Sequence, residues 1–118
     1  MVARTSARRW GASAAVSATL LGLLGGIAFA ALGPPHLVSQ KNQAFRPGQL
    51  AIKRGETVQI VNDDGDLLHH SYVESSQFNF DSGDQEPGAT VDITFPATGA
   101  FTVLCGIHPR MKLLVRVE

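Results

Sequence analysis

The residues best suited to chemistry lie in one short segment near the end of the chain, from Cys105 to Met111. The segment holds a thiol, the imidazole of His108 and a thioether, each separated from the next by two residues. A tight loop between two strands could aim all three donor atoms at one point. Thiolate and thioether sulfur, combined with imidazole nitrogen, favour copper over hard cations. The segment therefore predicts a copper site.

A second imidazole would complete the donor set of a blue electron-transfer site, in which one Cys and two His surround the metal and a Met lies at a longer axial distance. His69 and His70 can supply it, because they begin a β-prone run. Neighbouring residues of a strand face opposite sides, so only one of the two can point inward. The remaining histidine, His36, follows two prolines and has no motif around it.

Each of these residues also has an ordinary interpretation. A lone Cys at a strand end is usually a small buried hydrophobe, and a Met that opens a strand is usually part of a core. The coincidence favours a metal, because the chain has one Cys and two Met, and the only non-initiator Met falls at this spacing. A single Cys also excludes tetrathiolate zinc, iron–sulfur clusters and dinuclear copper sites within one chain.

The elements that must position these residues are expected to be strands. From Val38 onward, short runs with alternating apolar residues are separated by turn residues, and no stretch after residue 34 has a helical period. This pattern predicts an all-β protein, a Greek-key β-sandwich with one hydrophobic core. The clearest runs are 49–53, 57–62, 71–73, 91–95, 101–105 and 113–117.

The N-terminal segment is expected to direct export. Residues 1–9 contain three Arg and no acid, and the uncharged run from Trp10 to Gly33 follows. A small-x-small motif ends at Ala30, which is typical of a cleaved secretory signal. The run of 24 residues is also long enough for an uncleaved membrane anchor. Either outcome predicts a periplasmic or extracellular domain.

The expected organisation is a signal or anchor at 1–30, a linker and the start of a first strand at 31–44, and one domain at 45–118. The whole chain has no net charge, but removal of residues 1–30 takes three of the ten basic residues and leaves a net charge of −3. Many acids lie in two stretches, 63–66 and 81–86. They are read as solvated loop carboxylates that could also steer a basic partner, and no basic patch points to nucleic acid.

Several motifs of the chain resemble those of a known family. The loop Cys105-x-x-His108-x-x-Met111 is similar to the ligand loop of amicyanin, and Val61-Asn62-Asp63-Asp64 followed by His69 resembles plastocyanin-like domains. Further motifs fit the same family: Phe80-Asp81-Ser82-Gly83, Pro87-Gly88 and Phe95-x-x-x-Gly99-x-Phe101-x-Val103-x-Cys105. From about Phe45 to Glu118 the chain thus resembles the cupredoxins.

The resemblance implies one type 1 copper ion, with His69, Cys105 and His108 as equatorial ligands and Met111 as the axial one. His70 stays an alternative to His69, because the loop before His69 is about one residue longer than usual in the family. In many cupredoxins an Asn follows the first ligand and tethers the ligand loop. His70 takes that place here.

The function that the resemblance implies is single-electron transfer by a small exported monomer that is not an enzyme. Its partner would be a redox protein such as a c-type cytochrome or a dehydrogenase, and electrons would leave through His108. The alternative is a periplasmic copper-binding or carrier module, although the tail lacks the Met- and His-rich surface that exchange would favour. A copper nitrite reductase domain would need a second copper site, for which only His36 and the spare member of the 69/70 pair remain.

Overall fold

The structure, a computed structural model, describes residues 33–118. The proposed signal or anchor at 1–30 lies outside the described residues. Nine strands follow one another, and the described part of the chain contains no helix. The strands are β1 (His36–Lys41), β2 (Ala44–Arg46), β3 (Gln49–Ile52), β4 (Thr57–Asn62), β5 (His69–Glu74), β6 (Asn79–Gln85), β7 (Thr90–Thr94), β8 (Gly99–Cys105) and β9 (Lys112–Val117).

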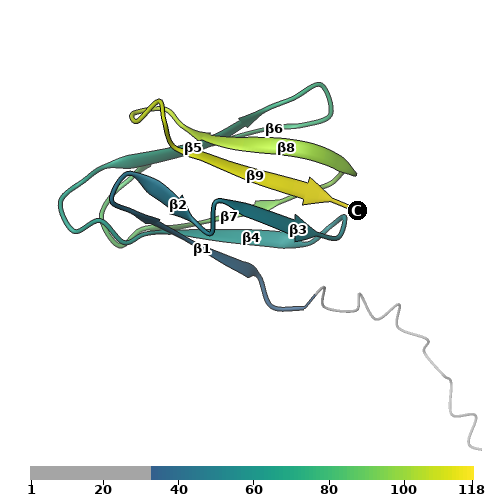
Figure 1. Ribbon diagram of the computed structural model, residues 1–118, viewed down its shortest axis with the longest axis horizontal. Coiled ribbons are helices and arrows are strands. Elements are labelled where there is room, and N and C mark those ends of the chain that lie inside the picture. The colour runs from purple at the N-terminus through teal and green to yellow at the C-terminus, as the bar shows by residue number, and fades with distance from the viewer. Residues whose placement is uncertain (1–32) are drawn as a thin grey trace, which may run out of the picture.

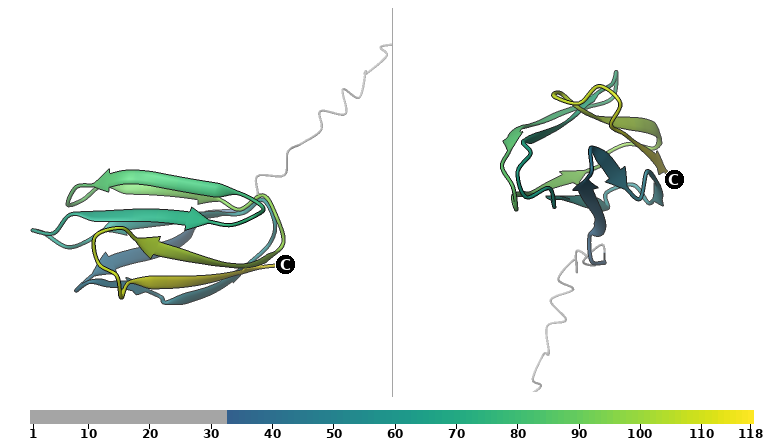
Figure 2. Two further views of the ribbon diagram at one scale, coloured as in Figure 1. Left: turned by 90° about the horizontal axis from the view of Figure 1, so that it is seen from above. Right: turned by 60° about the vertical axis from the view of Figure 1, so that its left-hand side comes forward.

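The strands form two sheets that face each other (Figure 1). One sheet has the order β2-β1-β4-β7 and the other has the order β3-β9-β8-β5-β6. Both are mixed, because β1 runs parallel to β4 and β3 runs parallel to β9, whereas the other neighbours are antiparallel. The turned views in Figure 2 show the same two layers. The predicted β-sandwich is confirmed.

Strand pairing starts earlier than the sequence pattern indicated. His36 already pairs with Val58, so β1 begins two residues before Val38, where the alternating pattern was expected to start. The motif Phe80-Asp81-Ser82-Gly83, for which no strand was predicted, lies within the edge strand β6, which pairs with β5. Backbone hydrogen bonds to a neighbouring strand hold such polar segments in a sheet without an alternating apolar pattern.

The core between the sheets is apolar at one end of the sandwich and polar at the other. Phe78, Phe95 and Phe101 pack edge to face, with ring centroids of Phe78 and Phe101 5.0 Å apart. The remaining buried apolar residues continue this core toward the middle. The buried polar residues gather near the other end and are Gln40, Asn62, Asp64, His69, Ser71 and Gln85.

The polar end, called here the loop end, carries the β1–β2 turn, the 63–68 loop and the 106–111 loop. The start of β1 and the end of β9 both lie at the opposite end, where His36 contacts Glu56 and the N–H of Glu118 donates to the carbonyl of Ile52. In Figure 1 the C-terminus lies at this end, away from the loop that joins β8 and β9. Within residues 33–118 no helix is long and apolar enough to cross a membrane.

Candidate metal centre

Three predicted donors come from two neighbouring strands and the loop that follows one of them. Cys105 ends β8, and His69 begins β5, whose Ser71 pairs directly with Cys105. His108 lies in the loop between β8 and β9. Residues far apart in the sequence are therefore adjacent at the loop end, because the antiparallel register of β5 and β8 fixes them there.

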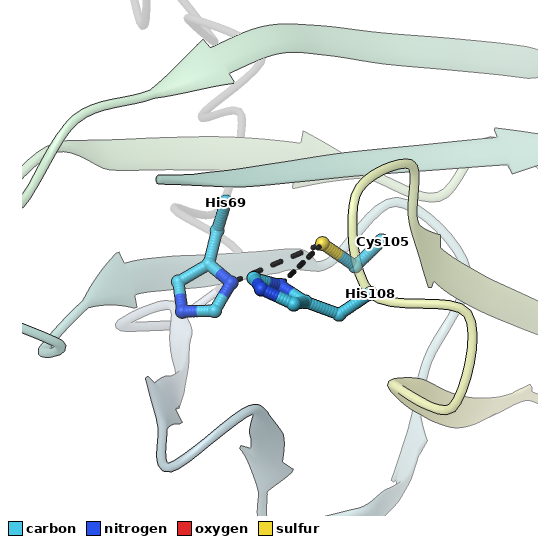
Figure 3. A group of neighbouring side chains, drawn as sticks. All are labelled: His69, Cys105 and His108. Atoms are coloured by element: carbon cyan, nitrogen blue, oxygen red, sulfur yellow. Dashed lines mark hydrogen bonds between the residues drawn. The ribbon is translucent and has the colours of Figure 1, made fainter. Parts of the chain in front are cut away.

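The donor atoms of these residues converge (Figure 3). Cys105 Sγ lies 3.9 Å from His69 Nδ1 and 3.7 Å from His108 Nδ1, and all three donor atoms lie within 4.8 Å of one another. With metal–nitrogen bonds of about 2.0 Å and metal–sulfur bonds of about 2.3 Å, the sulfur and nitrogen bound to one ion lie roughly 3.5–3.8 Å apart. The separations thus fit a shared metal ion with little movement of the side chains.

The loop that carries His108 is held at both ends. The N–H of Gly106 donates to the carbonyl of His70, and the N–H of Met111 donates to the carbonyl of His108. A Cβ on Gly106 would lie 3.0 Å from the ring of His70, so the close approach of these two segments favours glycine. Met111 is buried at the end of the loop.

Exposure differs sharply among the predicted residues. Cys105, Met111 and His69 are buried, and His69 has no exposed surface at all. His108 is half-buried and lines a surface hollow of about 380 Å³ together with Gln43, Pro109 and Arg110. The group is closed toward the interior and reaches the surface at His108.

His70 points away from this group. Its Nε2 lies 2.6 Å from Asp81 Oδ1 on the outer face of the sheet, and its ring stands edge-on to Tyr72. A hydrogen bond from the N–H of Gly83, followed by that from His70, holds the pKa of Asp81 below its ordinary value. The structure therefore brings together the donors of His69, Cys105 and His108, and it leaves His70 outside.

A carboxylate that the sequence did not predict lies behind His69. Asp64 Oδ2 lies 2.6 Å from His69 Nε2, and both side chains are buried. Burial works to raise the pKa of Asp64, but hydrogen bonds from His69 and from the backbone N–H groups of Asn42 and Gln43 outweigh it and hold the pKa below the ordinary value. No pattern separates Asp64 from its neighbours Asp63 and Asp66, so the sequence carried no signal for it.

A buried polar network ties the same end of the two sheets together. Gln40 of β1 donates to Ser71 of β5 and to Gln85 of β6, and Ser71 also donates to Gln85. Asn62 donates to the carbonyls of Leu67 and Gln85 and thereby anchors the 63–68 loop. Hydrogen-bonded buried polar groups of this kind fix one arrangement of the chain.

The donor set suits copper. Thiolate and two imidazoles in a largely buried group match the equatorial set of a blue-copper site, whereas hard cations require oxygen ligands. Zinc accepts the same atoms but is usually held by four strong protein ligands when its site is structural.

Comparisons with known proteins give the fold its name. No family model and no curated protein matches the chain. Among solved structures, the copper-containing nitrite reductase of Thermus scotoductus is similar with a TM-score of 0.65 and 33% identity over 72% of this chain. The chain spans only 22% of that protein's length.

Two kinds of smaller protein match over most of their own length. A reduced amicyanin mutant has a TM-score of 0.65 and 21% identity over 71% of this chain and 82% of its own. A purple cupredoxin from Nitrosopumilus maritimus has a TM-score of 0.62 and 23% identity over 70% of this chain and 99% of its own. The chain has the cupredoxin fold, as the resemblance predicted.

Proposed function

We propose that the protein is a blue-copper electron carrier with one copper ion held by His69, Cys105 and His108, and by Met111 as a weak axial ligand. The convergence of one sulfur and two Nδ1 atoms at 3.7 and 3.9 Å carries the proposal. Bound copper would supply the one-electron couple. The protein would supply a fixed donor geometry, because a rigid site needs little rearrangement when the charge changes.

Each ligand has a distinct role in this proposal. Cys105 provides the strong thiolate bond, and the buried His69 closes the site on the inner side. His108 provides the route to the surface, because it lies at the rim of a hollow and is half-exposed. Exposed Ile107 and Pro109 flank it, which gives a small apolar contact area suited to brief encounters with a redox protein.

We infer that the chain is exported and passes electrons to or from a partner such as a c-type cytochrome or a dehydrogenase, with no reaction of its own. Among the described residues, the other histidines do not form a second metal group. His36 contacts Glu56 at the opposite end of the sandwich, and His70 contacts Asp81 on the outer face. A catalytic copper like that of a larger copper enzyme would need ligands from elsewhere.

An absorption spectrum tests the proposal directly. One equivalent of Cu(II) added to the purified full chain should produce an intense visible band, and a reductant should bleach it reversibly. A Cys105→Ser variant is the control, because a serine oxygen cannot provide the sulfur-to-copper charge transfer. A colourless wild-type chain, or one with only weak absorption, would refute the blue-copper function.

A further inference from the structure

The carboxylate of Asp64 is buried and lies directly behind His69, a proposed copper ligand. Its Oδ2 is 2.6 Å from Nε2 of His69, on the side of the ring opposite the atom that faces Cys105. Asp64 is 7% exposed and His69 is 0% exposed. Buried carboxylates are costly unless they are fully hydrogen-bonded. The position of this carboxylate therefore needs an explanation.

Both oxygens of Asp64 face hydrogen-bond donors. Oδ1 accepts from the N–H of Asn42 at 2.8 Å, and the N–H of Gln43 also donates to the carboxylate. Asn42 and Gln43 are the two residues of the β1–β2 turn and have φ values of 53° and 55°. Consecutive residues in this left-handed conformation point their N–H groups to the same side, which forms an anion-binding concavity.

The backbone of Asp64 is fixed as well. Its N–H donates to Asn62 Oδ1 at 3.0 Å, and Asn62 in turn donates to the carbonyls of Leu67 and Gln85. The carboxylate is thus held from the turn on one side and from β4 on the other. Because an ionised carboxylate only accepts, the hydrogen bond to His69 requires a proton on Nε2, and in the neutral imidazole this leaves Nδ1 free of hydrogen.

We propose that Asp64 is a positioning residue: it fixes the tautomer and the ring orientation of His69 so that an unprotonated Nδ1 faces Cys105, and its negative charge favours the oxidised metal. The inference rests on the proposed function for the metal, but the tautomer is a property of the metal-free chain. Carboxylates that accept from the second nitrogen of a ligand histidine orient the ring and increase its donor strength.

The Asp64→Asn variant tests this role because a carboxamide has only one oxygen. That oxygen can accept either from the turn or from His69, and the NH₂ group must face the other donor. The turn supplies two N–H groups, so we expect the NH₂ group to face Nε2 of His69. The matched control is Asp63→Asn, which removes the same charge from the adjacent residue, whose exposed side chain bonds Ser39 instead.

The first measurement is a long-range ¹H–¹⁵N correlation spectrum of the histidine side chains in the metal-free full chain at neutral pH. The wild-type chain and Asp63→Asn should show His69 with hydrogen on Nε2 only. Asp64→Asn should shift it at least partly to Nδ1, and Asp64→Glu, which keeps two acceptors, should retain the wild-type tautomer. Hydrogen on Nδ1 in the wild-type chain would overturn the proposal without any variant.

The second measurement is the reduction potential of the copper-loaded proteins. Loss of the charge should shift the Cu(II)/Cu(I) preference of Asp64→Asn at least tenfold toward Cu(I), an increase of about 59 mV or more, while Asp63→Asn should change far less. Equal potentials and tautomers in Asp64→Asn and Asp63→Asn would refute the role of Asp64. A wild-type chain that binds no copper would refute the proposed function. The role of Asp64 would still be tested by the tautomer of His69 in the metal-free chain.

Discussion

Two neighbouring histidines of this chain have the same chemical partner and opposite surroundings. His69 Nε2 and His70 Nε2 each lie 2.6 Å from an aspartate oxygen. The first pair is buried at 0% and 8% side-chain exposure, and the second is exposed at 25% and 67%. Strand alternation alone sends one ring between the sheets and the other to the outer face.

The difference shows that the same histidine–carboxylate contact has different roles in different surroundings. At the surface, solvent screens the charge of Asp81, and such contacts contribute little to stability. In the interior, where both side chains are buried, the same contact determines which ring nitrogen carries hydrogen. The role of each histidine therefore depends on the layer of the sandwich that surrounds it.

Substitution of each histidine by alanine should give the largest difference between the two sites, measured as the intensity of the copper band. His69→Ala should abolish the intense copper band, whereas His70→Ala should retain it. His69→Ala would also leave one oxygen of Asp64 buried without its donor, which costs about 1–3 kcal/mol and should appear in chemical denaturation of the metal-free chain. Retention of the band in His69→Ala with its loss in His70→Ala would reverse the assignment of the two rings.

Substitution of Met111 tests whether this buried loop residue is a ligand of the metal centre. Met111→Gln should still bind copper and stay coloured, because an axial ligand tunes the potential rather than holding the metal. An oxygen donor stabilises Cu(II), so the potential should fall by about 59 mV or more, which is a tenfold change in preference. Cyclic voltammetry measures it, and an unchanged potential would make Met111 a core residue only.

The contact between Gly106 and His70 gives this partly exposed histidine a structural role. Gly106→Ala places a methyl group 3.0 Å from the His70 ring, which Asp81 holds in place. We expect a loss of about 1 kcal/mol in unfolding free energy from overpacking. The same substitution in a His70→Ala background should cost nothing, and a double-mutant cycle measures the coupling. Additive effects would show that the ring simply moves aside.

The smallest effect is expected from Asp81→Asn. Because the pKa of Asp81 is lower in the folded chain than in the unfolded one, ionised Asp81 contributes stability above its ordinary pKa of about 4, and this contribution is lost as the pH falls through the lower, folded value. Asp81→Asn should make the acid limb of a stability–pH curve slightly shallower and leave the copper band unchanged. A large change in the band would link the outer pair to the centre.

Sequence patterns predicted the apolar strands well because their alternation follows directly from burial. They gave no strand for β6, and they did not show that polar residues of β1 such as Gln40 point inward and are paired with Ser71 and Gln85 across the sheets. The spacing of Cys105 and His108 predicted their proximity because one short loop connects them. Asp64 could not be predicted, since its partners Asn42 and Gln43 approach it only after β1, β2 and β4 assemble. The ligand roles themselves stay a prediction.

The start of β1 and the end of β9 lie at the opposite end of the sandwich from the donor group. This has a practical consequence for attaching the protein to an electrode. His36 and Glu118 lie at the end of the sandwich away from His108. A linker attached at either side of the described domain would therefore hold the His108 face outward, toward the solution. Immobilisation on an electrode through the C-terminus should leave exchange with a dissolved partner unobstructed, whereas attachment through a residue such as Arg110 should block it.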